Sequence, residues 1–241
     1  MSRFLLALAA AIVAAAPAFA QDPDSTSAPV DSSVVSGVGD DLPPETEPID
    51  VRVLRSFYNA DNPAYTGTME VANWTAYPVY WSASPVAWTT TLATDADIKP
   101  ALRLTLSQLA NYGATFAIKN LVRRPRPYVS LEDVDARDRQ HQGDRVFDPN
   151  SFPSGHTSSA FVIATSLSAS FPEWYVIAPS YAWATAVGVS RMYLGVHYPS
   201  DVLIGAGLGT ATALLVYLVI PEGSDDPGAN AAPIVSFRIP L

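Results

Sequence analysis

Residues 157–220 read TSSAFVIATSLSASFPEWYVIAPSYAWATAVGVSRMYLGVHYPSDVLIGAGLGTATALLVYLVI. These 64 residues carry only three charged side chains, Glu173, Arg191 and Asp201. Helices of a soluble bundle each present a charged face to water, and this segment has too few charges to supply one. Its last 19 residues are uncharged and are about long enough to cross the hydrocarbon core of a bilayer. The segment therefore predicts helices that contact lipid.

The flanking sequence from Val51 onward is also predicted to be helical, because no sustained alternation of apolar and polar residues occurs before residues 234–239. Pro100 suits a helix start, and Pro172 and Pro221 suit helix ends. We expect an all-α bundle of five to six membrane-embedded helices. The expected helices span about residues 50–58, 70–93, 100–120, 155–171, 174–190 and 200–220.

Two N-terminal segments are predicted to precede the helical domain of residues 51–241. Residues 1–20 place Arg3 ahead of an apolar run and end in Ala-Phe-Ala, which is the order of a secretory signal peptide. Residues 21–50 hold eight acidic residues, no basic residue and five prolines, a composition typical of a disordered tether. We therefore expect the chain to be exported to the cell envelope.

The composition excludes several classes of protein. A net charge of −9 argues against a cationic surface for nucleic acid. The absence of cysteine excludes a thiolate metal site and a cysteine nucleophile. Residues 128–150 are polar and are expected to form a surface loop. Trp74, Trp81 and Trp88 recur every seven residues, as one helical stripe would, and predict either a packed or membrane-facing surface or an aromatic wall for substrate.

Two motifs suit the binding of phosphate. Lys119-x6-Arg126-Pro127 ends the helix expected at 100–120, where an ammonium and a guanidinium can reach one anion. Pro-Ser-Gly-His at 153–156 opens the next apolar helix, whose first N–H groups form a cradle for phosphate. The serine at 154 equally suits a simple N-cap.

A third motif carries a histidine and a carboxylate four residues apart, in Ser190-Arg191-x5-His197-x3-Asp201. A carboxylate bonded to one imidazole nitrogen leaves the other nitrogen as a nucleophile or base. Asp201 equally suits a cap of the helix expected at 200–220.

In this order and spacing, the motifs resemble the three-part signature of the type 2 phosphatidic acid phosphatase and haloperoxidase superfamily. All 11 fixed positions are matched between Lys119 and Asp201. The dipeptide Arg-Pro occurs at 124–125 and again at 126–127, and the spacing of six selects Arg126.

The resemblance implies a helical, metal-independent phosphatase without a cofactor. It implies that His197 attacks phosphorus to form a phosphohistidine, that Asp201 orients His197, and that His156 protonates the leaving oxygen. The groups implied to bind the phosphate oxygens are Lys119, Arg126, Ser154, the N–H of Gly155, and Arg191. His141 matches no motif and is expected at the surface.

The apolar helices favour a lipid phosphate or diphosphate as the substrate, at a membrane. If the N-terminus lies outside and five helices cross the membrane, all three motifs meet on the external or periplasmic side. The expected inner loops, however, lack the excess of Lys and Arg that the positive-inside rule predicts.

Four other functions stay open from the sequence. One is a secreted phosphatase of broad specificity, and another is a haloperoxidase that holds vanadate on His197. A metal-dependent hydrolase with His156, His197 and Asp201 as ligands is disfavoured, because three basic side chains would repel the cation. The last is a membrane protein without enzymatic activity.

Overall fold

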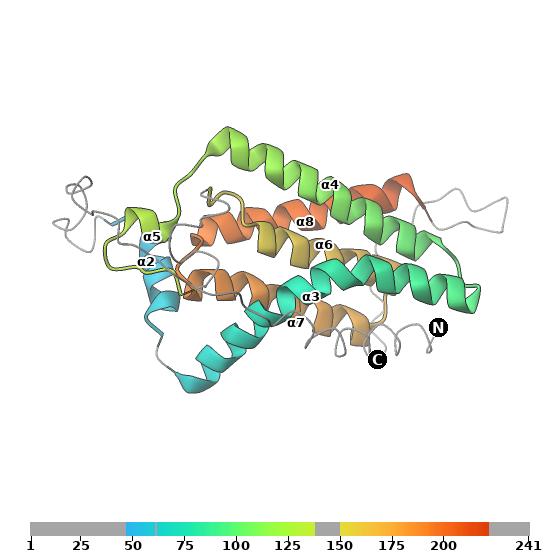
Figure 1. The fold of residues 1–241 in the computed structure, drawn as a ribbon, viewed down its shortest axis with the longest axis horizontal. Helices are drawn as coiled ribbons and strands as arrows, with labels where there is room; N and C mark the ends of the chain where they lie inside the picture. The colour runs from blue at the N-terminus through green and yellow to red at the C-terminus, as the bar shows by residue number, and fades with distance from the viewer. Residues whose placement is uncertain (1–46, 61, 138–149, 222–241) are drawn as a thin grey trace, which may run out of the picture.

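The computed structural model describes residues 47–60, 62–137 and 150–221, and helices make up most of this part of the chain (Figure 1). The seven helices are α2 (Ile49–Tyr58), α3 (Pro63–Thr94), α4 (Lys99–Val122), α5 (Pro127–Ser130), α6 (Gly155–Ser170), α7 (Trp174–Tyr193) and α8 (Pro199–Val219). These residues form no named strand, so the all-α prediction is confirmed. The single-turn α5 is the helix that the sequence pattern missed.

Most predicted helix boundaries lie within three residues of those observed, and the start of α3 differs most. Helix α3 begins at Pro63 rather than near 70, because Asn62 caps it and accepts a hydrogen bond from the Ala64 N–H at 2.9 Å. None of residues 63–68 is buried, so no apolar pattern marks this first part of the helix. Helix α2 begins at Ile49 and so takes in the last two residues of the predicted tether. The signal peptide, the rest of the tether and residues 234–239 lie outside the described residues.

The predicted surface loop at 128–150 is only partly correct. Its first residues form α5, and Val134 is buried with 2% of its surface exposed. The Arg137 N–H donates to the Leu194 carbonyl at 3.0 Å, which ties this stretch to the end of α7. Residues 138–149, with His141, lie outside the described residues.

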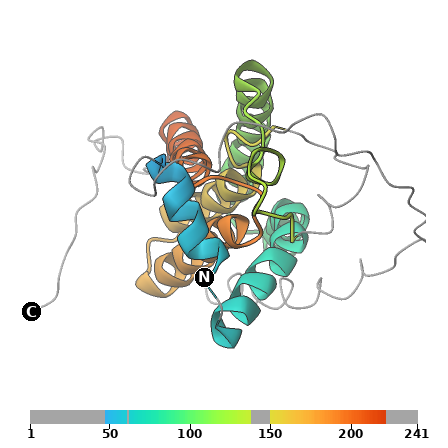
Figure 2. The ribbon, with the colours of Figure 1, turned by 90° about the vertical axis from the view of Figure 1, so that its left-hand side faces the viewer.

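Helix α6 lies at the centre of the bundle, between α3, α4, α7 and α8 (Figure 2). Short α2 packs across one end, against α7 and α8 (Figure 1). Apolar side chains of α3, α4, α6 and α8 form one core cluster, and those of α3, α6 and α7 form another. The central position of α6 places its N-terminus among the ends of three neighbouring helices.

Glycines on α8 allow α6 to approach closely. A Cβ atom at Gly205 would lie 2.7 Å from the Ser154 carbonyl oxygen, and one at Gly209 would lie 2.2 Å from the Ser158 carbonyl oxygen. Only a residue without a side chain fits at such distances. The two glycines therefore set the spacing between α6 and α8, and with it the position of the residues at the start of α6.

Many large apolar side chains on the outside of the bundle are exposed. On α4 they recur every three or four residues along one face, and on α8 they lie at both ends of the helix. The set includes Leu106, Leu109, Tyr112 and Phe116 on α4, and Leu203, Ile204, Leu214, Leu215 and Leu218 on α8. Trp74 and Trp81 of the tryptophan stripe are also exposed, at 54% and 77%. An apolar surface this extensive is typical of a face that meets lipid or another protein.

Among the described residues, α8 is the helix whose length and composition suit a membrane span, whereas the sequence predicts five crossing helices. Helix α6 has 16 residues and is about 24 Å long at 1.5 Å per residue, shorter than a bilayer core of about 30 Å.

The packing of α6 on α8 predicts that Gly209→Ala destabilises the fold and Gly207→Ala does not. The new methyl group at 209 would overlap α6 backbone, which costs about 1–3 kcal/mol. A Cβ at Gly207 meets no atom within 4 Å, and alanine is the better helix former. Thermal unfolding in detergent micelles measures both variants, and an equal midpoint for the two would contradict this account of the contact.

Candidate active site

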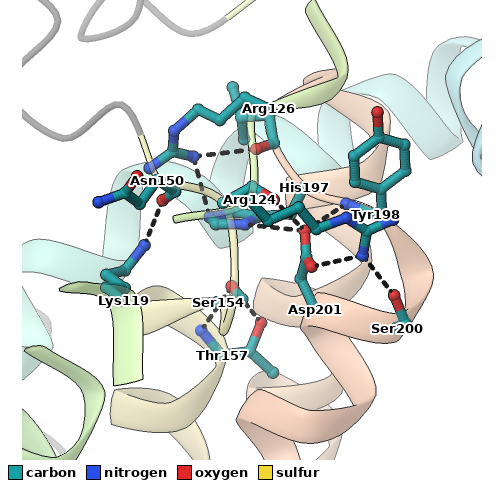
Figure 3. Close-up of polar contacts among 12 residues, drawn as sticks. Lys119, Arg124, Arg126, Asn150, Ser154, Thr157, His197, Tyr198, Ser200 and Asp201 are labelled. Carbon is teal, nitrogen blue, oxygen red and sulfur yellow. Dashed lines mark hydrogen bonds and ion pairs between the residues drawn. The ribbon is translucent and has the colours of Figure 1, made fainter. Parts of the chain in front are cut away.

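The three sequence motifs meet at the end of the bundle where α4 ends and α6 and α8 begin (Figure 3). Lys119 lies in the last turn of α4 and Arg126 caps α5. Arg191 lies in the last turn of α7, and His197 lies in the loop that leads to α8. All four side chains are buried, with at most 8% of their surface exposed. Four basic or titratable side chains from distant segments are thus brought to one place.

His197 contacts the guanidinium of Arg126. The Arg126 Nη1 lies 3.1 Å from Nε2 of His197, and it also donates to the Val196 carbonyl at 2.9 Å. Because a guanidinium only donates hydrogen bonds, Nε2 of His197 must be the acceptor. The proton of the neutral ring then lies on Nδ1, and Nε2 keeps its lone pair.

The other ring nitrogen of His197 faces Asp201. Its Nδ1 lies 3.6 Å from Oδ2 of Asp201, which is longer than a direct hydrogen bond. That oxygen also accepts hydrogen bonds from the Tyr198 N–H and from Oγ of Ser151, both at 2.8 Å. Asp201 therefore caps α8 and also lies beside the imidazole. Its position agrees with both interpretations of the sequence, a helix cap and a partner of His197.

Ser154 caps α6 as the simpler interpretation predicts. Its Oγ accepts from the backbone N–H of Thr157 and from the Thr157 hydroxyl, the latter at 2.9 Å. Its own N–H donates to the Asp201 carbonyl at 3.0 Å, which joins α6 to α8. A Cβ at the next residue, Gly155, would lie 3.9 Å from Cε of Lys119. The first N–H groups of α6, which have no acceptor within the helix, are therefore close to the lysine side chain.

The segment before α6 is held against the end of α4. Nζ of Lys119 donates to the Asn150 carbonyl at 2.6 Å, and the Ser151 N–H donates to the Arg124 carbonyl at 2.8 Å. A single antiparallel bridge pairs Asn150 with Pro125. These backbone contacts bring the first and second motifs together although they are about 30 residues apart.

Helix α3 contributes three residues that sequence reasoning missed. Asn73 accepts a hydrogen bond from Nη2 of the fully buried Arg191. The ring of Tyr77 lies edge-on to the His156 imidazole at 4.8 Å, and the hydroxyl of Tyr80 donates to the His156 carbonyl at 2.7 Å. Spacings of four and three residues put all three on one face of α3. That helical spacing is the signal in the sequence that could have identified them.

Arg124 and Asp50 are two further residues that the motifs do not include. Arg124 donates to Oδ1 of Asp201 at 2.9 Å (Figure 3). It also donates to Oδ2 of Asp50 at 2.7 Å. Burial lowers the pKa of Arg124, but the hydrogen bond with Asp50 and the charge of Asp201 outweigh it, so the pKa is raised overall. The guanidinium therefore remains positive beside the two carboxylates.

The charge of the cluster suits an anion. Lys119, Arg126 and Arg191 are buried cations, and the nearby carboxylates of Asp50 and Asp201 contact Arg124. In the part of the chain that the structure describes, no group of three or more His, Cys, Asp or Glu residues is arranged to hold a metal ion. The arrangement favours an oxyanion with several oxygens, because each cation and each helix N–H can donate to a different oxygen.

Comparison with known proteins supports this interpretation. Residues 100–224 match the PAP2 superfamily, which covers more than half of the chain. The chain therefore belongs to the PAP2 superfamily, as the motifs predict.

Three relatives match part of the chain. A bacitracin transport permease protein, BcrC, of Bacillus licheniformis is 38% identical over 101 residues, which are 40% of this chain and 44% of the relative. A lipid A 1-phosphatase of Porphyromonas gingivalis is 40% identical over 29% of this chain and 16% of the relative. A decaprenylphosphoryl-5-phosphoribose phosphatase of Mycobacterium tuberculosis is 36% identical over 41% of this chain and 49% of the relative. The chain thus spans less than half the length of each of these relatives.

Two solved structures share the fold. Aquifex aeolicus LpxE is 25% identical with a TM-score of 0.58, and the match covers 73% of this chain and 99% of that one. A transmembrane PAP2 type phosphatidylglycerolphosphate phosphatase of Bacillus subtilis is 23% identical with a TM-score of 0.54, over 70% of this chain and 83% of that one.

The cation cluster predicts that Lys119→Gln and Arg191→Gln weaken binding of inorganic phosphate about 10- to 100-fold, since a hydrogen bond to a charged group contributes about 1.5–3 kcal/mol. Arg123→Gln is the matched control, because Arg123 is exposed and its Nε donates to the Asn120 carbonyl in the same helix. Titrations followed by phosphorus NMR measure all three. Loss of binding in Arg123→Gln equal to that in the others would contradict the proposed position of the anion.

Proposed function

We propose that this protein is a cell-envelope phosphatase that hydrolyses a lipid phosphate or diphosphate through a phosphohistidine, without a metal ion. The observation that carries the proposal is the orientation of His197, whose Nε2 points to the cation Arg126 and whose Nδ1 faces Asp201. A phosphate that binds Arg126 in place of the imidazole would lie next to the Nε2 lone pair of His197. Membership of the PAP2 superfamily and relatives named as lipid phosphatases support the same activity.

In the proposed first step, Nε2 of His197 forms a bond to phosphorus as the bond from phosphorus to the lipid oxygen breaks. The leaving oxygen takes a proton from His156. The carboxylate of Asp201 stabilises the positive charge that the His197 ring acquires. Lys119, Arg126 and Arg191, with Ser154 and the N–H of Gly155, hold the oxygens of the transferring group, because positioning and charge stabilisation dominate phosphoryl transfer.

In the second step, water attacks the phosphohistidine. The bond between phosphorus and Nε2 breaks, and His156, now neutral, accepts a proton from the water. Inorganic phosphate leaves, and both histidines return to their starting protonation states. The edge-on contact with Tyr77 and the hydrogen bond from Tyr80 hold the His156 residue at the α6 start during both steps.

Exposed apolar residues next to the site support a lipid as the substrate. Leu121 and Val122 follow Lys119 and are exposed at 82% and 50%, and Leu203 follows Asp201 and is exposed at 71%. Acyl or prenyl chains can contact these side chains while the phosphate reaches the buried cations. A membrane-embedded bundle, with its site end at the lipid headgroups, accounts for the position of both groups.

We expect His197→Ala to abolish phosphate release while His141→Ala retains it. Purified wild type and both variants are assayed with EDTA present on phosphatidate, a polyprenyl diphosphate and a small soluble phosphomonoester. Release from the lipids above that from the soluble ester supports the lipid substrate. Equal release by His197→Ala would overturn the histidine mechanism. Bromide oxidation with vanadate and peroxide, without phosphate release, would instead identify a haloperoxidase.

The proposed orientation places the site end of the bundle on the external side of the membrane. The chain has no cysteine, so single cysteines can be introduced without background. Two exposed residues are each replaced by cysteine. Glu132 follows α5 at the site end, and Ala96 lies between α3 and α4 at the opposite end (Figure 1). In intact bacterial cells a membrane-impermeant maleimide should label Glu132→Cys, and it should label Ala96→Cys only after permeabilisation. The reverse pattern would place the site inside.

A further inference from the structure

Arg124 lies on the side of Asp201 that faces away from His197. Its Nη1 donates to Oδ1 of Asp201 at 2.9 Å and to Oγ of Ser200 at 2.7 Å, and its Nη2 donates to Oδ2 of Asp50 at 2.7 Å. The guanidinium also stacks on the ring of Tyr198, 3.8 Å from its centre. The arginines of the two Arg-Pro dipeptides thus have different environments. Arg126 contacts the His197 imidazole, and Arg124 contacts the Asp201 carboxylate behind it.

Asp50 accepts two hydrogen bonds from Ser200, the residue directly before Asp201. Its Oδ1 accepts the Ser200 N–H at 2.9 Å and its Oδ2 accepts the Ser200 hydroxyl at 2.5 Å. Ser200 lies in the first turn of α8, directly before Asp201, and Asp50 lies in the first turn of α2. The first turn of α2, the segment after α4 and the start of α8 are therefore joined by one set of charged hydrogen bonds.

The donors of Arg124 are directed at protein groups. Nη1 donates to Asp201 and Ser200, and Nη2 donates to Asp50. The flat face of the guanidinium stacks on the ring of Tyr198. Asp201 is fully buried, and its carboxylate is held by the Tyr198 N–H, the Ser151 hydroxyl and Arg124. Arg124 can therefore affect a bound phosphate through Asp201 and His197, without contact to the phosphate itself.

We propose that Arg124 and Asp50 form a positioning pair that holds the Asp201 carboxylate behind His197, so that the site extends to the first turn of α2. This inference rests on the proposed role of His197 as the nucleophile. Loss of Arg124 removes a charged donor from Asp201 and leaves the Asp50 and Asp201 carboxylates without the cation that they share. Asp201 is then held less firmly behind the imidazole, so His197 is aligned less well for attack, whereas the groups that bind the ground-state phosphate are unchanged.

Steady-state kinetics of lipid phosphate hydrolysis separate this role from direct phosphate binding. Arg124→Gln should lower kcat about 10- to 100-fold and leave KM within about twofold. Arg124→Lys keeps the charge but not the fork and should restore part of kcat. Arg123→Gln, the exposed neighbour, should match wild type. Raised KM at unchanged kcat would overturn the proposal by making Arg124 a phosphate ligand, and so would an equal loss in Arg123→Gln.

A double-mutant cycle tests whether Arg124 and Asp50 act as a pair. Asp50→Asn should lower kcat, and the double variant with Arg124→Gln should be no worse than Arg124→Gln alone. Additive losses would overturn the pairing. Thermal unfolding of every variant shows that it is folded, and Asp50→Asn and Arg124→Lys supply the test if Arg124→Gln is unstable.

Histidine NMR gives a readout that does not need turnover. The chain has three histidines, so carbon-labelled imidazole signals can be assigned with single His→Asn variants. The titration midpoint of His197 should move to higher pH in Arg124→Gln, because Asp201 loses its neutralising cation, and to lower pH in Asp50→Asn. The midpoint should not move in Arg123→Gln. Arg126 and Asp201, the charged groups that contact or face His197, are unchanged in these variants.

The two proposals fail in distinguishable ways. If wild type releases no phosphate from any substrate, the proposed function fails, and the NMR midpoints still decide whether Arg124 and Asp50 act on Asp201. If wild type is active but the midpoints of Arg124→Gln and Asp50→Asn match wild type, the positioning proposal fails and the phosphatase stands.

Discussion

The carboxylate of Asp201 is the point at which the segments of the site are joined. It accepts the N–H of Tyr198 at the start of α8, the hydroxyl of Ser151 before α6, and the guanidinium of Arg124 after α4. A buried carboxylate is strongly destabilising unless its oxygens are hydrogen bonded. The need to satisfy this one group therefore forces three distant segments to converge, and His197 is positioned by the same convergence.

The close packing of α6 on α8 gives this convergence its shape. Gly205 and Gly209 let the α8 backbone approach the Ser154 and Ser158 carbonyls. The start of α6 thereby lies beside the start of α8, where its N–H groups and the positive end of its dipole face the cations. The N-termini of α6 and α8 both lie at this end of the bundle, and each contributes the positive end of a helix dipole. Arg126 and Arg191 are buried at that end, while the sides of the bundle expose apolar side chains.

Much of this arrangement was predictable because its signals are local. Apolar composition and prolines located helices α4, α6, α7 and α8 within a few residues, and motif spacing selected Arg126 over Arg124. Caps are also local, so Ser154 and Asp201 could be assigned as helix caps from neighbouring residues alone. The start of α3 was not predicted, because its exposed first turns have no apolar pattern. The burial of Val134 was not predicted, because its neighbours in the sequence are mostly polar.

The sequence by itself determined the class of fold, the family and the residues proposed for phosphate chemistry, because periodicity, helix caps and motif spacing are properties of neighbours along the chain. Only the tertiary structure showed that Asp50, Asn73 and Arg124 belong to the same site. Asp50 meets Ser200 across 150 residues, and Asn73 meets Arg191 across 118. No local pattern marks such pairs, since a charged or amide side chain has the same sequence signature whether it faces water or a partner. Packing of the helices selects the partner.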